Sequence, residues 1–192
     1  MKQVVLSLFL MIAFAFTAQA NEEGARKFAL DTANQAVEVL ASGTSDSAKL
    51  QSLEDLFKAA VNTDWIGRFV VGKHWRNMDA TQQKSYLANY KAFLVKHYTS
   101  NFTEYAEGTE FEVTRSKVLK KNQYMVSMNI KRPTGGAAVK VDYRMRQKSG
   151  KYAIIDIVVE GVSLLNTQRS EFSSVIQRKG FDHLIEQLQP KS

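Results

Sequence analysis

The sequence predicts an α+β fold in which helices pack on a curved antiparallel sheet of about four to five strands. Three observations predict it. Helical apolar periodicity covers residues 25–98, period-two alternation covers residues 109–160, and helical periodicity returns from residue 168 onward. Separate runs of helices and strands are typical of this class, and the length suits one domain with a sizeable core.

The first twenty residues have the pattern of a signal peptide. Lys2 supplies a positive charge, Val4 to Phe16 is an apolar run, and Ala18-Gln19-Ala20 supplies small residues for cleavage. The apolar run is shorter than the roughly 20 residues that a membrane span needs. We expect cleavage between Ala20 and Asn21, with a mature domain over 21–192 outside the inner membrane. An uncleaved N-terminal anchor is the alternative.

Three helices are expected at the start of the mature chain. The first covers 25–41 with a small-sided stripe that predicts close packing, and the second follows possible N-caps at Ser45–Ser47. Asp64 is expected to cap a short third helix, which Gly72 ends. The apolar positions are Ala25, Ala29, Ala33, Ala36, Val37 and Leu40 in the first helix, Leu50, Leu53, Leu56, Phe57, Ala60 and Val61 in the second, and Trp65, Ile66, Phe69 and Val70 in the third.

The fourth helix has the strongest start signal, because Asp79 and Gln82 are spaced as in a capping box. Its apolar stripe contains Tyr86, Leu87, Tyr90, Phe93, Leu94, His97 and Tyr98. Tyrosines and a histidine on a buried face are unusual. From the residues alone an ordinary core is favoured, with each tyrosine hydroxyl hydrogen-bonded to backbone.

Four strands are expected after the helices, over 109–119, 122–131, 138–147 and 151–160 or beyond. The second and third strands alternate between apolar and polar residues, which is typical of an antiparallel sheet buried on one face. The fourth strand is apolar on both faces except at Asp156 and Glu160, so it is expected to be central or covered twice. Helices over about 168–179 and 181–189 finish the chain.

Positive charge is concentrated in the predicted sheet. The chain has a formal net charge of +7, and Arg115 to Lys151 contains eleven Lys or Arg and one acid, Asp142. This pattern fits a surface for anionic lipid headgroups or an acidic protein. It fits a solvated sheet face equally well. No nucleic-acid partner is expected for an exported chain.

Catalytic and metal-binding patterns are scarce in the sequence. The chain has no cysteine, which excludes disulfides and thiolate ligands, and its three histidines lie on separate segments. No phosphate-binding loop, zinc-protease or nucleophile-elbow motif occurs. Ser163, Asp156 and one histidine are the only triad that we consider, and we expect no enzyme activity and no metal site.

One C-terminal stretch resembles a known family. Asp156, Glu160-Gly-Val-Ser163, Arg169, Phe172, Ile176 and Lys179-Gly180 occur in an order similar to the MlaC-type, or toluene-tolerance, family of periplasmic phospholipid-binding proteins. Phe69 to Trp75, Ala80 to Tyr98, Tyr105, Val139 to Arg146 and Lys151-Tyr152 add to the resemblance, which runs from about Leu53 to Leu188. The chain differs from the family in its short C-terminus and in the short loop between its first two strands.

The resemblance implies a twisted sheet wrapped by helices and enclosing an apolar cavity. It implies a periplasmic carrier that shuttles glycerophospholipids between an outer-membrane lipoprotein complex and an inner-membrane ABC transporter with an MCE-domain subunit, maintaining outer-membrane lipid asymmetry. The bound phospholipid would be cargo, and no cofactor is implied. A lipid-free adaptor of the transporter is the alternative, and a hydrolase on a similar scaffold is a third reading.

Alternation and helical stripes then give candidate lipid-lining residues. These are Phe69, Tyr90, Phe93, Leu94, Tyr98, Tyr124, Val126, Met128, Val139, Val141, Tyr143, Met145, Ile155, Ile157 and Val159. Arg144 and Arg146 are candidates for headgroup contact or docking. The same alternation suits a solid core, so the pattern does not separate cavity residues from core residues.

Overall fold

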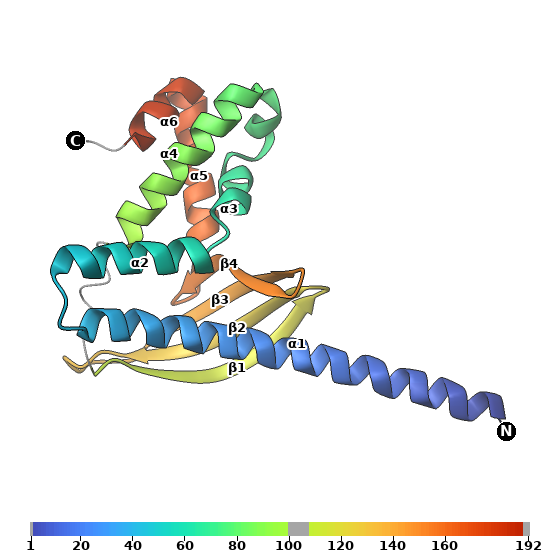
Figure 1. The fold of residues 1–192 in the computed structure, drawn as a ribbon. Helices are drawn as coiled ribbons and strands as arrows, with labels where there is room; N and C mark the ends of the chain where they lie inside the picture. Colours follow the sequence, from blue (N-terminus) through green and yellow to red (C-terminus); the bar gives the residue numbers. More distant parts are fainter. Residues whose placement is uncertain (1, 100–107, 190–192) are drawn as a thin grey trace.

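The computed structural model describes residues 2–99 and 108–189, and it has the predicted order of helices, strand meander and helices (Figure 1). The first helices are α1 (Lys2–Ala41), α2 (Asp46–Ala60), α3 (Thr63–Val71), the 3₁₀ helix η1 (Gly72–Asn77) and α4 (Ala80–Thr99). The strands are β1 (Glu110–Lys120), β2 (Gln123–Lys131), β3 (Val139–Lys148), β4 (Lys151–Val159) and β5 (Val162–Ser163). Helices α5 (Leu164–Lys179) and α6 (Phe181–Leu188) end the described chain. The α+β class is confirmed.

The helix starts follow the capping rules, with one correction. Asp79 and Gln82 form the predicted reciprocal box, with N–H to side-chain oxygen distances of 2.8 and 3.0 Å, and Ser45 caps α2. Asp64 is not the cap of α3. Asn62 takes that place, and its side chain accepts a hydrogen bond from the Trp65 N–H at 3.0 Å. The helix starts earlier than predicted because Asn62 directly precedes the first turn and its side chain can reach the free N–H groups there.

Helix α1 is much longer than the predicted 25–41 segment, because it continues back to Lys2. Figure 1 shows its N-terminal part projecting past the sheet. Contact with the sheet includes the backbone of Asn21, whose carbonyl accepts a hydrogen bond from the Tyr152 hydroxyl at 2.7 Å. Gly24 lies so close that a Cβ there would be 2.5 Å from the same hydroxyl oxygen. A glycine therefore lets the helix pass over Tyr152.

The sheet is an antiparallel meander with the strand order β1-β2-β3-β4-β5. Strand β4 is not central, because its second neighbour is only the two-residue β5; helices α2, α3 and α5 pack against it instead. The chain turns at Glu160 and Gly161, both with positive φ, so the strand stops at Val159. Helix α5 then starts at Leu164 rather than 168, since the Ser163 hydroxyl accepts the Asn166 N–H at 3.1 Å.

The helices gather on one side of the sheet and form two buried apolar clusters (Figure 1). The helical cluster joins α3 and α4 to α5 and α6, with Tyr86 and Tyr90 fully buried at its centre. The sheet cluster lies between α1 and the strands and contains Ala25, Tyr124 and Met145. The two clusters are built from different elements, and the space between them is where the candidate site lies.

Candidate functional site

A large apolar cavity lies between α1, α2 and the inner face of the sheet. Its volume is about 270 Å³, near the lower end of the range for small-molecule pockets, which starts at about 300 Å³. The lining residues are Ala29, Thr32, Ala33, Ala36, Val37, Leu40, Leu53, Leu56, Phe57, Ala60, Val61, Tyr98, Phe111, Ile130, Val141, Tyr143, Ile154, Ile157, Val159 and Leu164. Eight elements, four helices and four strands, therefore contribute walls to one space.

The wall contributed by α1 is made of short side chains. Ala29, Ala33 and Ala36 repeat at three- and four-residue steps, so they share one face of the helix. Small residues at these positions leave volume between the helix and the sheet. Val37 and Leu40 continue the same face and stay half-exposed, which gives the cavity an apolar wall within reach of solvent.

The chemistry of this cavity suits an apolar ligand. None of its lining residues carries a formal charge, and the polar lining side chains are Thr32, Tyr98 and Tyr143. The Thr32 hydroxyl already donates to the Phe28 carbonyl at 2.8 Å. Such a wall can bury methylene groups but offers little directional recognition.

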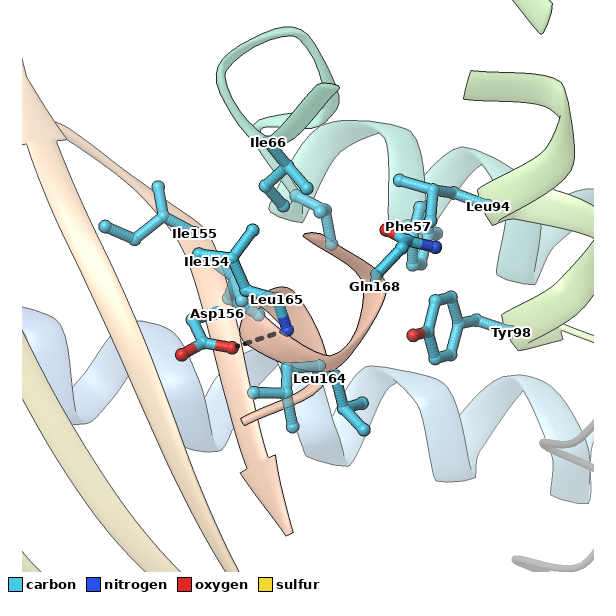
Figure 2. Close-up of a pocket in the computed structure, with 12 residues that line it drawn as sticks. Phe57, Ile66, Leu94, Tyr98, Ile154, Ile155, Asp156, Leu164, Leu165 and Gln168 are labelled. Carbon is cyan, nitrogen blue, oxygen red and sulfur yellow. Dashed lines mark hydrogen bonds between the residues drawn. The ribbon is translucent and has the colours of Figure 1, made fainter. Parts of the chain in front are cut away.

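A smaller cavity of about 40 Å³ continues the large one toward the helical cluster (Figure 2). The two spaces share the lining residues Phe57, Val61, Tyr98, Ile154, Ile157 and Leu164. Beyond this shared wall, Ile66, Leu94 and Gln168 surround the inner end. The cavities therefore adjoin, and the phenol of Tyr98 lies where they meet.

A buried carboxylate fixes the junction between β4 and α5 beside the small cavity. Asp156 is 4% exposed, and its side chain accepts a hydrogen bond from the Leu165 N–H at 3.1 Å (Figure 2). It also accepts one from the Ser163 hydroxyl at 2.8 Å. Arg144 completes the set with an ion pair at 3.1 Å. The Ser163 hydroxyl therefore caps α5 and is bonded to Asp156, so both side chains hold this junction together.

A β-bulge decides which residues of β4 line the large cavity. Arg144 is opposite Asp156 while Met145 is opposite Ile154, so Ile155 is an extra residue in the ladder. An inserted residue moves the following side chains to the other face. Ile154, Ile157 and Val159 consequently line the large cavity, whereas Ile155 lines the small one.

The structure brings part of the predicted lining set together. Tyr98, Val141, Tyr143, Ile157 and Val159 line the large cavity, and Leu94, Tyr98, Ile155 and Ile157 line the small one. Other predicted residues pack in the two clusters and line neither cavity: Phe69, Tyr90 and Phe93 in the helical cluster, and Tyr124, Val126, Met128 and Met145 in the sheet cluster. Val139 pairs with Ile130 at the start of β3 and also lines neither.

Arg144 and Arg146 lie on the face of the sheet opposite the cavity. The β3 residues that line the cavity are Val141 and Tyr143, and side chains alternate along a strand, so the even-numbered neighbours point outward. Arg144 is already paired with Asp156, while Arg146 is exposed near the end of the strand. Docking therefore suits their position better than contact with a headgroup at the cavity.

The residues that sequence reasoning missed come mainly from α1 and α2. Their apolar stripes were recognised but were interpreted as ordinary packing faces. Phe111, Ile130, Ile154 and Leu164 are further additions. A run of alanines on the α1 stripe was the one available signal, because small side chains on a buried face either allow close packing or leave space.

The buried tyrosines of α4 belong to the core, and both make hydrogen bonds. The Tyr86 hydroxyl donates to the Gly67 carbonyl at 2.9 Å, as expected for a backbone partner. Tyr90 instead donates to the side-chain oxygen of Gln168. Burial raises the pKa of both phenols well above their ordinary value of 10.0.

These raised pKa values predict a loss of stability in alkali. Below about pH 10 both the folded and the unfolded chain keep the phenol protons, so stability is complete. Above that pH the unfolded chain loses protons that the folded core retains, which lowers the free energy of unfolding by up to about 1.4 kcal/mol per pH unit for each tyrosine. We expect Tyr90→Phe to have a shallower decline than wild type in urea titrations. Parallel declines would contradict this.

No group of three or more His, Asp or Glu side chains positioned for a metal ion occurs within residues 21–98 and 108–189. Likewise, no helix among the residues that could be searched is long and apolar enough to cross a membrane.

Comparisons with known proteins agree with the geometry. A family model described as "MlaC protein" matches residues 30–190. The intermembrane phospholipid transport system binding protein MlaC of Haemophilus influenzae is 24% identical over 132 residues, covering 67% of this chain and 61% of that protein. The match therefore spans less than two thirds of that relative. A phospholipid-binding protein from Ralstonia solanacearum, solved in complex with a phospholipid, has a similar fold, with a TM-score of 0.72 at 17% identity over 84% of this chain and 93% of that one.

Proposed function

The chain belongs to the MlaC family, and we propose that it is a phospholipid carrier that holds a glycerophospholipid by its acyl chains in the large cavity. The observation that carries the proposal is the uncharged wall between α1, α2 and the sheet. Each methylene that enters such a space gains about 0.8 kcal/mol. Acyl chains would be held without directional contacts, while the charged headgroup stays toward solvent because burying it is costly.

The small cavity supports a path for the end of an acyl chain. It continues from the large cavity past Tyr98, and its other walls are Ile66, Leu94 and Ile155. An acyl chain longer than the large cavity would extend into the small one. The residues that we propose to contact lipid are therefore those that line the two cavities. The other lipid-lining candidates predicted from the sequence that lie in the core support the cavity walls.

The carrier would take part in transport between the two membranes of the cell envelope. The Haemophilus relative is named for intermembrane phospholipid transport. We propose exchange with an outer-membrane lipoprotein complex and an inner-membrane ABC transporter with an MCE-domain subunit, which would maintain lipid asymmetry of the outer membrane. A tightly held lipid leaves slowly, so each partner must favour a more open state of the carrier.

Export of the protein follows from the same proposal. Residues 1–20 would be a signal peptide, and cleavage after Ala20 would leave a periplasmic protein that starts at Asn21. This position agrees with the packing, because Asn21 is held at the sheet by Tyr152 and by the Gln147 amide, which donates to its side-chain oxygen at 3.3 Å. The protein would act without a cofactor and without catalysis.

Native mass spectrometry of detergent-free protein from the periplasm tests the proposal. We expect a one-to-one adduct with the mass of a phospholipid, and solvent extraction would identify its headgroup and chains. The mass of the stripped polypeptide would report the cleavage site in the same experiment. Folded protein without an adduct would contradict the carrier and would favour a lipid-free adaptor of the transporter.

A further inference from the structure

The two hairpin turns β1–β2 and β3–β4 lie at the same end of the sheet. The register shows this, because Gln123 at the start of β2 is opposite Arg146 near the end of β3. Both turns are tight and contain residues with positive φ, Asn122 in one and Ser149 with Gly150 in the other. The side chains that they bring together are Val118, Leu119, Lys120, Lys121, Arg146, Lys148 and Lys151, which we name the basic tip.

The basic tip combines exposed aliphatic groups with cations. Val118 and Leu119 are 44% and 41% exposed, and they are adjacent in the chain. Lys120 and Lys121 follow directly and are exposed. Single exposed aliphatic residues are common on protein surfaces, but an adjacent pair at a hairpin turn beside flexible lysines can enter a lipid interface while the ammonium groups remain in the headgroup layer.

The nearest acid to the basic tip that a described hydrogen bond identifies is Glu22 of α1, which accepts from the Ser116 hydroxyl of β1 at 2.7 Å. Among the described residues, no ion pair within 4.0 Å involves Lys120, Lys121, Arg146, Lys148 or Lys151. Asp142, the one acid among residues 115–151, lies further along β3 opposite Ser127. Five exposed cations thus share one end of the sheet, where their fields add.

We propose that the basic tip is a contact surface for an anionic phospholipid bilayer. Charge alone would suit an acidic protein as well, but the exposed Val118–Leu119 pair favours a surface with both anionic headgroups and accessible hydrocarbon.

The large cavity extends away from the basic tip, starting at Ile154, which pairs with Met145 next to Arg146. Phe111 and Ile130, which line the cavity, are paired near the opposite end of β1 and β2. A protein resting on its basic tip would therefore hold the Phe111–Ile130 end of the cavity away from that bilayer. The surface acts as a tether, and the proposal does not depend on what the cavity holds.

Vesicle sedimentation tests the proposal with purified protein whose N-terminus has been verified by mass. The vesicles are phosphatidylcholine alone, or phosphatidylcholine with a quarter of phosphatidylglycerol. We expect the protein to bind the anionic vesicles only, and added salt should weaken this binding. In the double variant Lys120→Glu/Lys121→Glu, the affinity should fall by roughly fivefold for each lysine lost. Val118→Ser/Leu119→Ser should also weaken binding, with the salt dependence retained.

The matched control is Lys84→Glu/Lys91→Glu, which makes the same charge change at two exposed positions of α4. This control is expected to keep most of the binding. Equal loss in the control and the basic-tip variant would overturn the proposal, as would wild-type protein that ignores vesicle charge or stays in the supernatant. Retained cargo and an unchanged circular dichroism spectrum would show that each variant is folded, so failure here is distinct from failure of the carrier function.

Discussion

Replacement of Ala36 by tryptophan is expected to remove most of the bound lipid from the protein. Ala36 lies on the α1 face that lines the large cavity, and the indole ring would occupy space that acyl methylenes otherwise fill. Displacing two or more methylenes, at about 0.8 kcal/mol each, lowers affinity by at least about tenfold. The measurement is the ratio of phospholipid to protein after purification without detergent.

The neighbouring position supplies the control for this prediction. Gln35 is exposed on the same helix, so Gln35→Trp adds the same ring outside the cavity. We expect the control to retain lipid at the wild-type ratio. Full lipid retention by a folded Ala36→Trp protein, judged by its thermal unfolding, would mean that this face of α1 is not a lipid-contacting wall.

Loss of the Asp156 carboxylate is expected to be the most destabilising single change. Asp156→Ala would leave the Leu165 N–H without its acceptor and would break the pair with Arg144. Removing one partner of a buried polar network costs several kcal/mol, and Arg144 is 41% exposed and can find water, so we expect about 2–4 kcal/mol. Urea unfolding monitored by circular dichroism measures the loss.

Asp142→Ala is the matched control, because it removes a carboxylate from the same outer face of the sheet at a half-buried position of β3. It should cost much less than Asp156→Ala. Asp156→Asn should fall between them, since the amide oxygen can still accept from the Leu165 N–H. Equal unfolding free energies for the two alanine variants would show that the junction between β4 and α5 does not depend on this carboxylate.

Local chemistry made much of the fold predictable. The capping box at Asp79 and Gln82 and the alternation of β2 and β3 place those elements within a residue or so of the observed bounds. These signals act over a few residues, so they can be read from sequence. The early start of α5 was missed because it depends on Ser163 and on Asp156, a partner that becomes adjacent only after folding.

The candidate site was less predictable than the fold. Strand alternation is the same whether a face meets other side chains or empty space, so Tyr124 and Tyr143 looked equivalent. The structure places Tyr124 in the sheet cluster and Tyr143 in the cavity wall, because α1 approaches closely at Gly24 and its later alanines leave space. The bulge at Ile155 is a property of the β3–β4 pair and has no signature within β4 alone.

The two apolar clusters also set an order in which the chain can become compact. Every strand pairs with its neighbour in sequence, so the meander needs only short loops to close. The helical cluster instead joins α3 and α4 to α5 and α6, which the whole sheet separates in sequence, and such distant contacts form slowly. Leu184 and Leu188, only 2% and 3% exposed, belong to the last helix. A chain that emerges from its N-terminus can therefore form its sheet early, whereas its helical cluster stays open until nearly the last residue has arrived.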